Sequence, residues 1–457
     1  MFEEFHPTKY ERLIFNSGID PLQASVLSAT ARSLRITHIS PDDEQSVVNE
    51  TASGFVAPFV FLYVWWVLCE AKKKGLKRLY FLARDGQIFY KVADLLVKEW
   101  SLNVDVRYLY CSRESLLLPS FEQGGAFERN WLTWGYLNSI TLNEFCERLR
   151  INVFDLHSIQ AFRNLSAYFD DPTQIIGRED MPAFLCAIAT HEFSEFVREK
   201  IRPLTDLTLS YLVQEGIDGE EPFAVVDTGW RGSSQYAISA LMKKGGIRPV
   251  DGIKGYYVGL NFDVFKYGND QLHSFLFDWR KERRDYRLYN FICFEMLFSA
   301  DHGRTTNYIY EKLRVIPVVN DVVNNKYKKI IDIHHYLSVE FARRSSKVLQ
   351  FSQFDSRYVS ACRQLARKFI STPSFGESDL YGEWPNASEI REGDYQPIAP
   401  AMTLRSFLRC ALGQDKIKGF WPQASLSRGG LNSAMLLYNL FLDTGLLDWY
   451  RRVFLRY

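Results

Sequence analysis

The stretch that most constrains the fold is residues 223–242, FAVVDTGWRGSSQYAISALM. Its four apolar residues followed by Asp227 predict a buried β-strand that ends in an acid. The next loop, residues 228–234, is rich in Gly and Ser, and the apolar spacing after it predicts an α-helix. Such a junction is suited to an anion, because free backbone N–H groups and the helix dipole meet there. The pattern also fits a plain strand-to-helix turn with Ser233 as the N-cap.

This loop supplies the first candidate ligand contacts. Asp227, at the carboxyl end of the predicted strand, is suited to hold sugar hydroxyls or a metal ion. The two glycines allow a ligand to approach the backbone closely, and an arginine adds a fixed positive charge. The candidates in the loop are Thr228, Gly229, Arg231, Gly232, Ser233 and Ser234.

Two further loops follow predicted strands. Residues 77–82 predict a strand that runs into an Arg–Asp pair, and residues 104–110 predict a strand that runs into Cys-Ser-Arg-Glu. Because ligands of open α/β sheets gather outside the carboxyl ends of the strands, we expect these loops to line one cleft. The first loop also fits an internal ion pair in a turn, and the second fits an ordinary capped helix start. The candidates are Arg84, Asp85, Ser112 and Arg113.

A fourth group of candidates surrounds Glu295. Residues 291–299, FICFEMLFS, fit either a helix or a strand, and Glu295 lies among their apolar side chains. An unpaired carboxylate is costly there, so the sequence predicts a partner for it. Arg84, Arg113 or Arg231 could supply that partner. His302 and Arg304 follow in a glycine-containing loop, and the whole group fits a structural salt bridge as well as a site.

The order of elements predicts an α/β protein with a Rossmann-like, doubly wound, mostly parallel sheet. Residues 1–50 predict an N-terminal helical segment. Residues 51–120 and 220–310 predict the α/β core, interrupted by a helical insertion at 121–219. Residues 311–457 predict a mostly helical C-terminal region.

The composition bears on the partners of the protein and on its cellular location. The formal net charge of +1 gives no sign of nucleic-acid binding. Seven cysteines without a CxxC pair predict reduced thiols and a cytoplasmic protein. The longest apolar run, residues 55–69, is shorter than the roughly 20 residues that a bilayer span needs. It predicts a buried helix, with peripheral contact at the inner face of a membrane as the alternative.

Several catalytic motifs are absent from the sequence. It contains no Asp-x-Asp, which is the nucleophile motif of haloacid-dehalogenase phosphatases and the metal motif of many nucleotide-sugar glycosyltransferases. It also lacks GxGxxG and GxxxxGK[ST], which weakens dinucleotide and P-loop interpretations. No GxSxG nucleophile elbow occurs.

Four segments together resemble a known protein group. They are residues 54–96, the RYLYCSRESLLLP segment at 107–119, AVVDTGWRGSSQ at 224–235 and FEMLFSADHG at 294–303, and WPQASLSRGG at 421–430 is a weaker echo. This set is similar to the domain found beside haloacid-dehalogenase-type phosphatases in bacterial polysaccharide-synthesis proteins, often labelled as predicted hydrolases of that superfamily. The resemblance covers roughly residues 50–310.

The resemblance implies a glycan phosphoribosyltransferase. Such an enzyme transfers 5-phosphoribosyl from phosphoribosyl pyrophosphate (PRPP) to a growing glycan, and a phosphatase then removes the 5-phosphate. This chain lacks the phosphatase motifs, so a separate phosphatase partner would be needed. The loop after Asp227 is similar to the PRPP loop of ordinary phosphoribosyltransferases, although it has one acid instead of two adjacent ones.

On this hypothesis Asp85 is the general base and Asp227 holds ribose hydroxyls or Mg²⁺, with Asp85 as a second metal ligand. Arg84, Arg113 and Arg231 would neutralise the pyrophosphate and the 5-phosphate. Two other interpretations stay open. One is a non-catalytic or regulatory α/β module that binds a sugar phosphate, and the other is a phosphoesterase of the haloacid-dehalogenase type that uses an unfamiliar motif.

Overall fold

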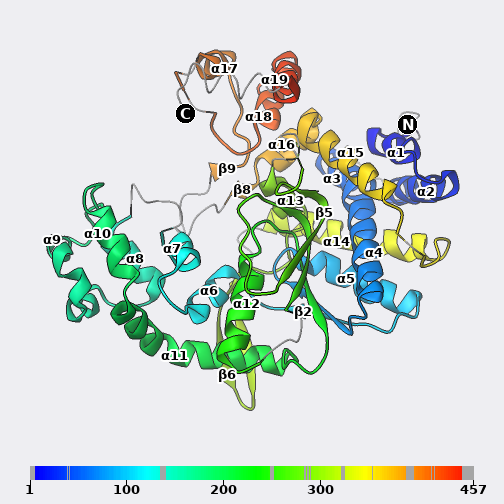
Figure 1. The fold of residues 1–457 in the computed structure, drawn as a ribbon. Coiled ribbons are helices and arrows are strands. Elements are labelled where there is room, and N and C mark those ends of the chain that lie inside the picture. Colours follow the sequence, from blue (N-terminus) through cyan, green and yellow to red (C-terminus); the bar gives the residue numbers. More distant parts are fainter. Residues whose placement is uncertain are drawn as a thin grey trace.

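The protein has an all-parallel, five-stranded sheet with strand order β2-β1-β3-β4-β5 (Figure 1). The strands are β1 (Arg78–Leu82), β2 (Asp105–Leu109), β3 (Phe223–Asp227), β4 (Lys254–Leu260) and β5 (Gln271–Asp278). The computed structural model describes residues 6–38, 40, 42–133, 140–247, 252–282, 285, 288, 290–320, 325–352, 354–386, 396–412, 414, 415 and 417–444.

The strand order reverses between β1 and β3. β1 pairs with β2 on one side, where Leu82 lies opposite Leu109, and with β3 on the other, where Phe81 lies opposite Val226. The chain therefore leaves β1 in one direction to form β2 and later returns to form β3 on the opposite side. A reversal of this kind opens a crevice at the carboxyl edge of the sheet.

Both faces of the sheet are covered by helices, as the continuous run of buried apolar residues in β1 requires. Leu79 and Phe81 face a large core with the helices α4 (Ala57–Lys73) and α5 (Gly86–Glu99). Tyr80 and Leu82 face a second core on the other side. The helices of that second side are α6 (Arg113–Ser120), α11 (His191–Gln214) and α12 (Ser233–Lys244). The α/β class and the parallel, doubly covered sheet are thus confirmed.

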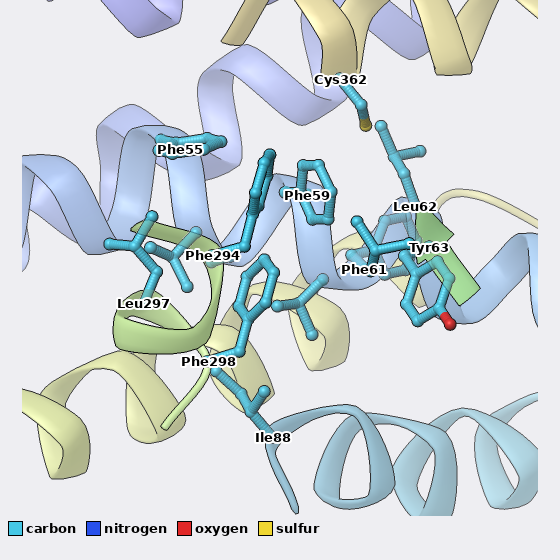
Figure 2. Packing of buried hydrophobic residues seen from close by; sticks show 14 of the residues in the cluster. Phe55, Phe59, Phe61, Leu62, Tyr63, Ile88, Phe294, Leu297, Phe298 and Cys362 are labelled. Carbon is cyan, nitrogen blue, oxygen red and sulfur yellow. The ribbon is translucent and has the colours of Figure 1, made fainter. Parts of the chain in front are cut away.

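The central helix of the first core is longer than the sequence predicts. The apolar pattern indicates a start near Ser53, but α3 (Asp43–Thr51), a π-helical turn (Ala52–Val56) and α4 form one continuous helical segment. The added part, DEQSVVNET, belongs almost wholly to the N-terminal segment that the sequence predicts as helical, but it is polar and carries no clear apolar period, so no local pattern shows that it continues into α4. In Figure 2, Phe55, Phe59, Phe294 and Phe298 fill the space beside this segment.

Within the described residues one helical segment, Asp43–Lys73, is long and apolar enough to cross a membrane. Its most apolar window has a mean hydropathy of 1.8, yet 89% of that window is buried inside the protein. Phe59, for example, is fully buried and packs edge-on against Phe275. The expectation of a buried core helix is confirmed.

The described residues between β2 and β3 form a series of helices. Their cluster of buried side chains merges with the second core through Phe193, Val197 and Ile201 of α11. After α6 they form α7 (Ala126–Thr133), α8 (Leu142–Leu149), two 3-10 helices (Val153–Ser158 and Gln160–Leu165), α9 (Ala167–Asp170), α10 (Met181–Ile188) and α11.

A β-hairpin after the sheet escaped the sequence analysis. β6 (Thr305–Glu311) and β7 (Arg314–Val319) pair antiparallel, so the expected domain boundary after residue 310 falls inside the hairpin. The turn lacks the Asn-Gly or Asp-Gly signal of a tight hairpin, and Lys312 adopts the left-handed conformation instead, with φ 55°. Gln214 of α11 fixes the hairpin by bonding both the N–H and the carbonyl of Val315.

Most described residues of the C-terminal region lie in helices. α14 and α15 pack beside α4, and the N-terminal helices pack against them in turn. Trp421 is fully buried and donates a hydrogen bond to the carbonyl of Ile370, which fastens the last part of the chain to α15. The elements are α1 (Lys9–Phe15), α2 (Pro21–Thr37), α14 (Asn325–Ser346), α15 (Arg357–Ser371), α16 (Phe375–Gly382), β8 (Pro385–Asn386), β9 (Gln396–Pro397), α17 (Leu404–Ala411), α18 (Pro422–Arg428) and α19 (Asn432–Thr444).

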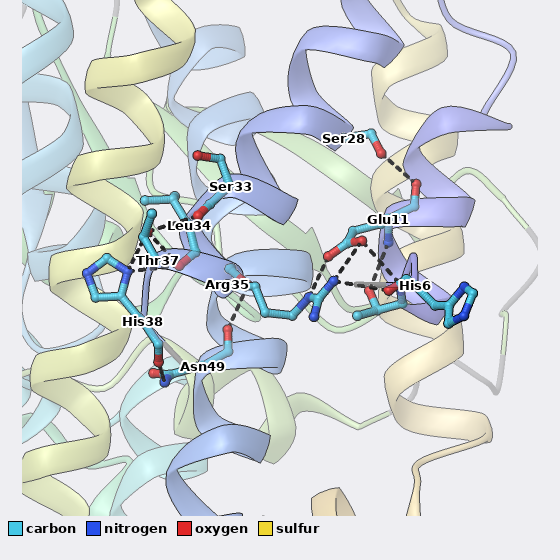
Figure 3. Close-up of polar contacts among 11 residues, drawn as sticks. His6, Glu11, Ser28, Ser33, Leu34, Arg35, Thr37, His38 and Asn49 are labelled. Carbon is cyan, nitrogen blue, oxygen red and sulfur yellow. Dashed lines mark hydrogen bonds and ion pairs between the residues drawn. The ribbon is translucent and has the colours of Figure 1, made fainter. Parts of the chain in front are cut away.

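A buried ion pair joins α1 to α2. Arg35 donates from Nε to Glu11 Oε1 over 2.7 Å and also bonds the carbonyl of His6 (Figure 3). The Glu11 side chain is only 2% exposed, and it also accepts the N–H of Thr8. A buried carboxylate of this kind depends on its partner, because removing one ion leaves the other uncompensated.

We expect Arg35→Met to lower the free energy of unfolding by about 3 kcal/mol, since it leaves the Glu11 carboxylate buried without its cation. The double variant Arg35→Met/Glu11→Gln should regain at least half of the loss, because the amide carries no charge and still accepts the Thr8 N–H. Urea unfolding of the wild type and both variants measures this. Equal destabilisation of the single and the double variant would contradict the account.

Candidate functional site

The candidate site lies at the carboxyl edge of the sheet, where the strand order reverses. The loop that joins β1 to α5 carries Arg84 and Asp85, and β3 ends on Asp227. Because β1 and β3 are hydrogen-bonded neighbours, these two loops lie side by side. The hydroxyl of Tyr63, in α4, donates a hydrogen bond to the backbone carbonyl of Asp227 and so holds the end of β3.

Three carboxylates converge there. Burial raises the pKa of Asp85 well above its ordinary value, and the negative charges of Glu295 and Asp227 raise it further, whereas Arg84 lowers it. Burial also raises the pKa of Asp227 to about 7, and Glu295 adds to that rise. A bond from the Thr228 N–H to Asp227 Oδ1, 2.8 Å long, acts in the opposite direction. This mutual repulsion makes the group receptive to positive charge.

Glu295 has a hydrogen-bond partner that the sequence does not indicate. Its segment is a helix, α13 (Phe291–Leu297), and Glu295 Oε1 accepts a hydrogen bond from the indole N–H of Trp230 over 2.9 Å. This indole donor was not among the three arginines considered as partners, and it does not decide whether one of them also pairs with Glu295. Trp230 is 9% exposed and stacks on Phe291 with ring centroids 4.4 Å apart. One aromatic residue thus fixes the third carboxylate to the loop after β3.

The three arginines of the hypothesis divide into two groups. Arg84 and Arg113 are exposed side chains near the carboxylates, since Arg84 lowers the pKa of Asp85 and Arg113 lowers that of Asp227. Arg231 instead pairs with Asp263 over 2.9 Å. It also stacks on the ring of Phe265 and donates to Asn130 of α7. Its charge is largely compensated, so it fastens the loop to the helical insertion.

The glycines of the loop are required by the neighbouring strands. A Cβ on Gly229 would lie 2.6 Å from the carbonyl oxygen of Gly259 in β4, and one on Gly232 would lie 2.5 Å from Leu272 in β5. Gly232 is also the N-cap of α12, with φ 74°, so the proposed N-cap role of Ser233 is wrong. No side chain caps this helix, and Ser233 and Ser234 form its first turn.

The loop after β2 begins with a cap, as one of its two interpretations held. The Ser112 hydroxyl accepts the N–H of Ser115 and donates to the carbonyl of Thr305. Glu114, in the first turn of α6, forms an ion pair with Arg304 over 2.9 Å. Ser112 and Arg304 therefore connect this loop to the start of the β6–β7 hairpin.

His302 reaches the site through a tyrosine that the sequence analysis did not single out. Its Nδ1 donates to the carbonyl of Gly303, so Nε2 accepts the hydrogen bond from the Tyr108 hydroxyl over 2.7 Å. Burial is the main cause that lowers the pKa of His302, which favours this neutral form. The nearby charge of Asp85 adds to the rise that burial imposes on the pKa of Tyr108.

The residues that sequence reasoning missed are Tyr108, Asn130, Trp230 and Asp263. Tyr108 lies on a strand where alternation predicts only burial. Trp230 stands in the motif DTGWRG among small residues, where no local pattern indicates a specific partner for its ring. Asn130 and Asp263 come from elements distant in the sequence, and no local pattern indicates that they meet Arg231.

A divalent cation fits the residue types of the site. Asp85 and Asp227 offer carboxylate oxygens, and Mg²⁺ commonly binds one or two carboxylates together with water and substrate phosphates. Across the part of the chain that the structure describes, no group of three or more His, Cys, Asp or Glu side chains is arranged to hold a metal ion. The fit of a cation therefore rests on Asp85 and Asp227, whose negative charges repel each other and which a bound cation would both stabilise.

Comparison with known proteins adds no assignment: no family model matches the chain, and no curated protein matches it. The site must be interpreted from its own chemistry.

We expect Gly229→Ala to destabilise the protein by about 2–4 kcal/mol, because the added Cβ meets a backbone carbonyl that cannot move aside. Gly246→Ala is the matched control. Its φ of 72° is also left-handed, but a Cβ there meets nothing within 4 Å, so its cost should stay near 1 kcal/mol. Chemical unfolding measures both, and equal losses would show that close approach does not decide the choice of glycine.

The pKa of Asp227 predicts a pH dependence. A carboxyl whose pKa is raised by folding keeps its proton between about pH 4 and pH 7 only in the folded state. Folding stability therefore falls as pH rises through this window, and Asp227→Asn should remove that fall. We expect the variant to gain about 1–2 kcal/mol over the wild type at pH 8 relative to pH 5. Asp206→Asn, an exposed change on α11, is the control; no pH-dependent gain from Asp227→Asn would refute the raised pKa.

Proposed function

We propose that the protein transfers the 5-phosphoribosyl group of PRPP to a hydroxyl of a glycan acceptor and releases pyrophosphate. The observation that carries the proposal is the group of three carboxylates, with exposed arginines beside it, at the reversal of a parallel sheet. Phosphorylated ligands of open α/β sheets bind at this position. The four segments that resemble the glycan phosphoribosyltransferases contain all of these residues.

The electrostatics suit a transition state with positive charge on the sugar. When the bond between the anomeric carbon and pyrophosphate weakens, the ribosyl ring acquires oxocarbenium character, which nearby carboxylates stabilise. Burial is the main cause of the raised pKa values of Asp85 and Asp227, and the negative charge of Glu295 adds to both. A developing cation relieves the repulsion among these negative charges, so the carboxylates bind the transition state better than the substrate.

Asp85 is assigned as the general base. In the reaction the acceptor oxygen forms a bond to the anomeric carbon, the bond to pyrophosphate breaks with its electron pair, and the acceptor proton passes to Asp85. A raised pKa brings a carboxylate closer to the operating pH, which improves proton transfer. Asp227 then orients the ribose hydroxyls, and Glu295, held by Trp230, faces the sugar as a fixed charge.

The phosphates are assigned to the positive elements around the carboxylates. Arg84 and Arg113 would meet the pyrophosphate, which Mg²⁺ held by Asp85 and Asp227 would help to neutralise. The uncapped first turn of α12, with Ser233 and Ser234, suits the 5-phosphate. The compensated charge of Arg231 assigns it to positioning the loop. Removal of the 5-phosphate falls to a separate phosphatase.

The test incubates the protein with PRPP, Mg²⁺ and a panel of glycan acceptors, and measures pyrophosphate release and the mass gain of one phosphopentose. Asp85→Asn should lower the transfer rate by at least a hundredfold, because the base is lost, while calorimetric binding of PRPP persists. Asp227→Asn should weaken PRPP binding as well. Asp206→Asn, which removes an exposed carboxylate far along α11, should change neither.

Each outcome decides between the candidate functions. PRPP binding without transfer to any acceptor supports a sugar-phosphate-binding module instead of an enzyme. Release of phosphate from simple phosphoesters supports a phosphoesterase. If PRPP does not bind at all, the proposal fails, and an active Asp85→Asn variant moves the base to another residue.

A further inference from the structure

Exposed apolar side chains concentrate at the C-terminal end of the structure. We call the described residues between 400 and 444 the C-terminal lobe; it contains α17, α18 and α19 and lies at the top of Figure 1. The described part of the chain has nineteen large apolar side chains that are exposed, and seven of them lie in this short lobe. They are Leu404, Leu408, Leu412, Phe420, Leu436, Leu437 and Leu440. Such a concentration marks an interaction surface.

Helix α17 presents part of this surface as an amphipathic stripe. Leu404, Leu408 and Leu412 are one turn apart and are 56%, 52% and 66% exposed. Phe407, on the adjoining part of the helix, packs against the small core of the lobe. No residue of α17 is buried, so the helix lies on the outside of the lobe with its leucines in solvent.

Helix α19 contributes a second stripe. Leu436, Leu437 and Leu440 are 59%, 44% and 54% exposed. The side of the helix that turns inward carries Met435 and the polar Asn439, both buried. The amide of Asn439 donates to the carbonyl of Ser371, so this polar residue fastens the helix while its leucines stay outside.

Basic side chains flank the leucines. Arg405 and Arg409 lie one turn apart beside the stripe of α17, and Lys418 follows nearby in the chain. The acidic groups of the same surface are Asp415, which pairs with Arg409, and Asp443. Leucine stripes with arginines at their border are typical of helices that lie in a membrane interface. Protein interfaces instead draw their energy mainly from Trp, Tyr and Arg, and Leu is under-represented there.

We propose that the C-terminal lobe docks on an anionic membrane surface, with the leucines of α17 and α19 in the acyl boundary and the basic side chains at the headgroups. The proposal assigns membrane contact to this lobe and not to the apolar Asp43–Lys73 helix, which the core covers. It does not depend on the reaction at the sheet edge, because no residue of the candidate site takes part.

The docked lobe would be connected to the candidate site. The side-chain amide of Asn290 donates to the carbonyl of Phe420 in the lobe over 3.1 Å, while its oxygen accepts the N–H of Cys293 and so caps α13. α13 carries Glu295. The membrane surface and the third carboxylate are therefore joined through one capping residue.

The experiment measures co-sedimentation of the full-length protein with vesicles of phosphatidylcholine alone or mixed with phosphatidylglycerol. We expect binding to the mixed vesicles that weakens as salt rises. Leu404→Ser/Leu408→Ser should lower it about tenfold, because two leucines no longer enter the bilayer. The matched control is Leu22→Ser/Val348→Ser, which alters side chains of 68% and 56% exposure elsewhere, and it should bind as the wild type does.

A second variant removes positive charges and leaves the leucines in place, so it tests the headgroup contact separately. Arg405→Gln/Lys418→Gln should weaken binding to phosphatidylglycerol vesicles about tenfold and leave binding to pure phosphatidylcholine unchanged. Circular dichroism and thermal unfolding confirm that each variant is folded. The proposal is overturned if the wild type does not bind the mixed vesicles, or if the leucine pair has no effect on binding. It is also overturned if light scattering shows a dimer that the leucine pair dissociates while vesicle binding is unchanged, since the surface then joins two copies.

Discussion

The candidate site depends on one constraint of the sheet: five parallel strands bring all their carboxyl ends to the same edge. There the loops after β1 and β3 become neighbours although more than a hundred residues separate them in sequence. The reversal between these strands places Asp85 beside Asp227. The cores on both faces make that position rigid, because neither strand can move without disturbing the helices packed above and below it.

Local patterns account for the part of this arrangement that the sequence predicts. Apolar runs ending in Asp227 or in the Arg84–Asp85 pair indicate buried strands whose ends carry chemistry, and the structure has those strands within one or two residues of the prediction. The partner of Glu295 could not be predicted in the same way. Pairing an acid with an arginine is a rule about charge, whereas the actual donor, Trp230, is chosen by how two aromatic rings pack across distant segments.

The other features that the sequence does not predict also depend on contacts between distant segments. The continuity of the long helical segment from Asp43 into α4 and the β6–β7 hairpin lack strong local signals, and tertiary contacts decide them. Gly232 differs from these features. The sequence indicates that it lets a ligand approach the backbone, whereas the structure shows that packing against Leu272 already requires a glycine there. Packing and ligand binding both favour glycine at a strand-to-helix turn, so a sequence alone does not separate them.

Asn290 couples the C-terminal lobe to the helix that carries Glu295. Its side-chain amide makes one hydrogen bond to the first turn of α13 and another to the backbone of the C-terminal lobe. Glu295 follows five positions later in the same short helix. A displacement of the lobe would therefore be transmitted to the cap of α13, in addition to the contacts by which Trp421 and Asn439 hold the lobe to α15. The position of Glu295 is in this way sensitive to how the C-terminal lobe sits on the rest of the protein.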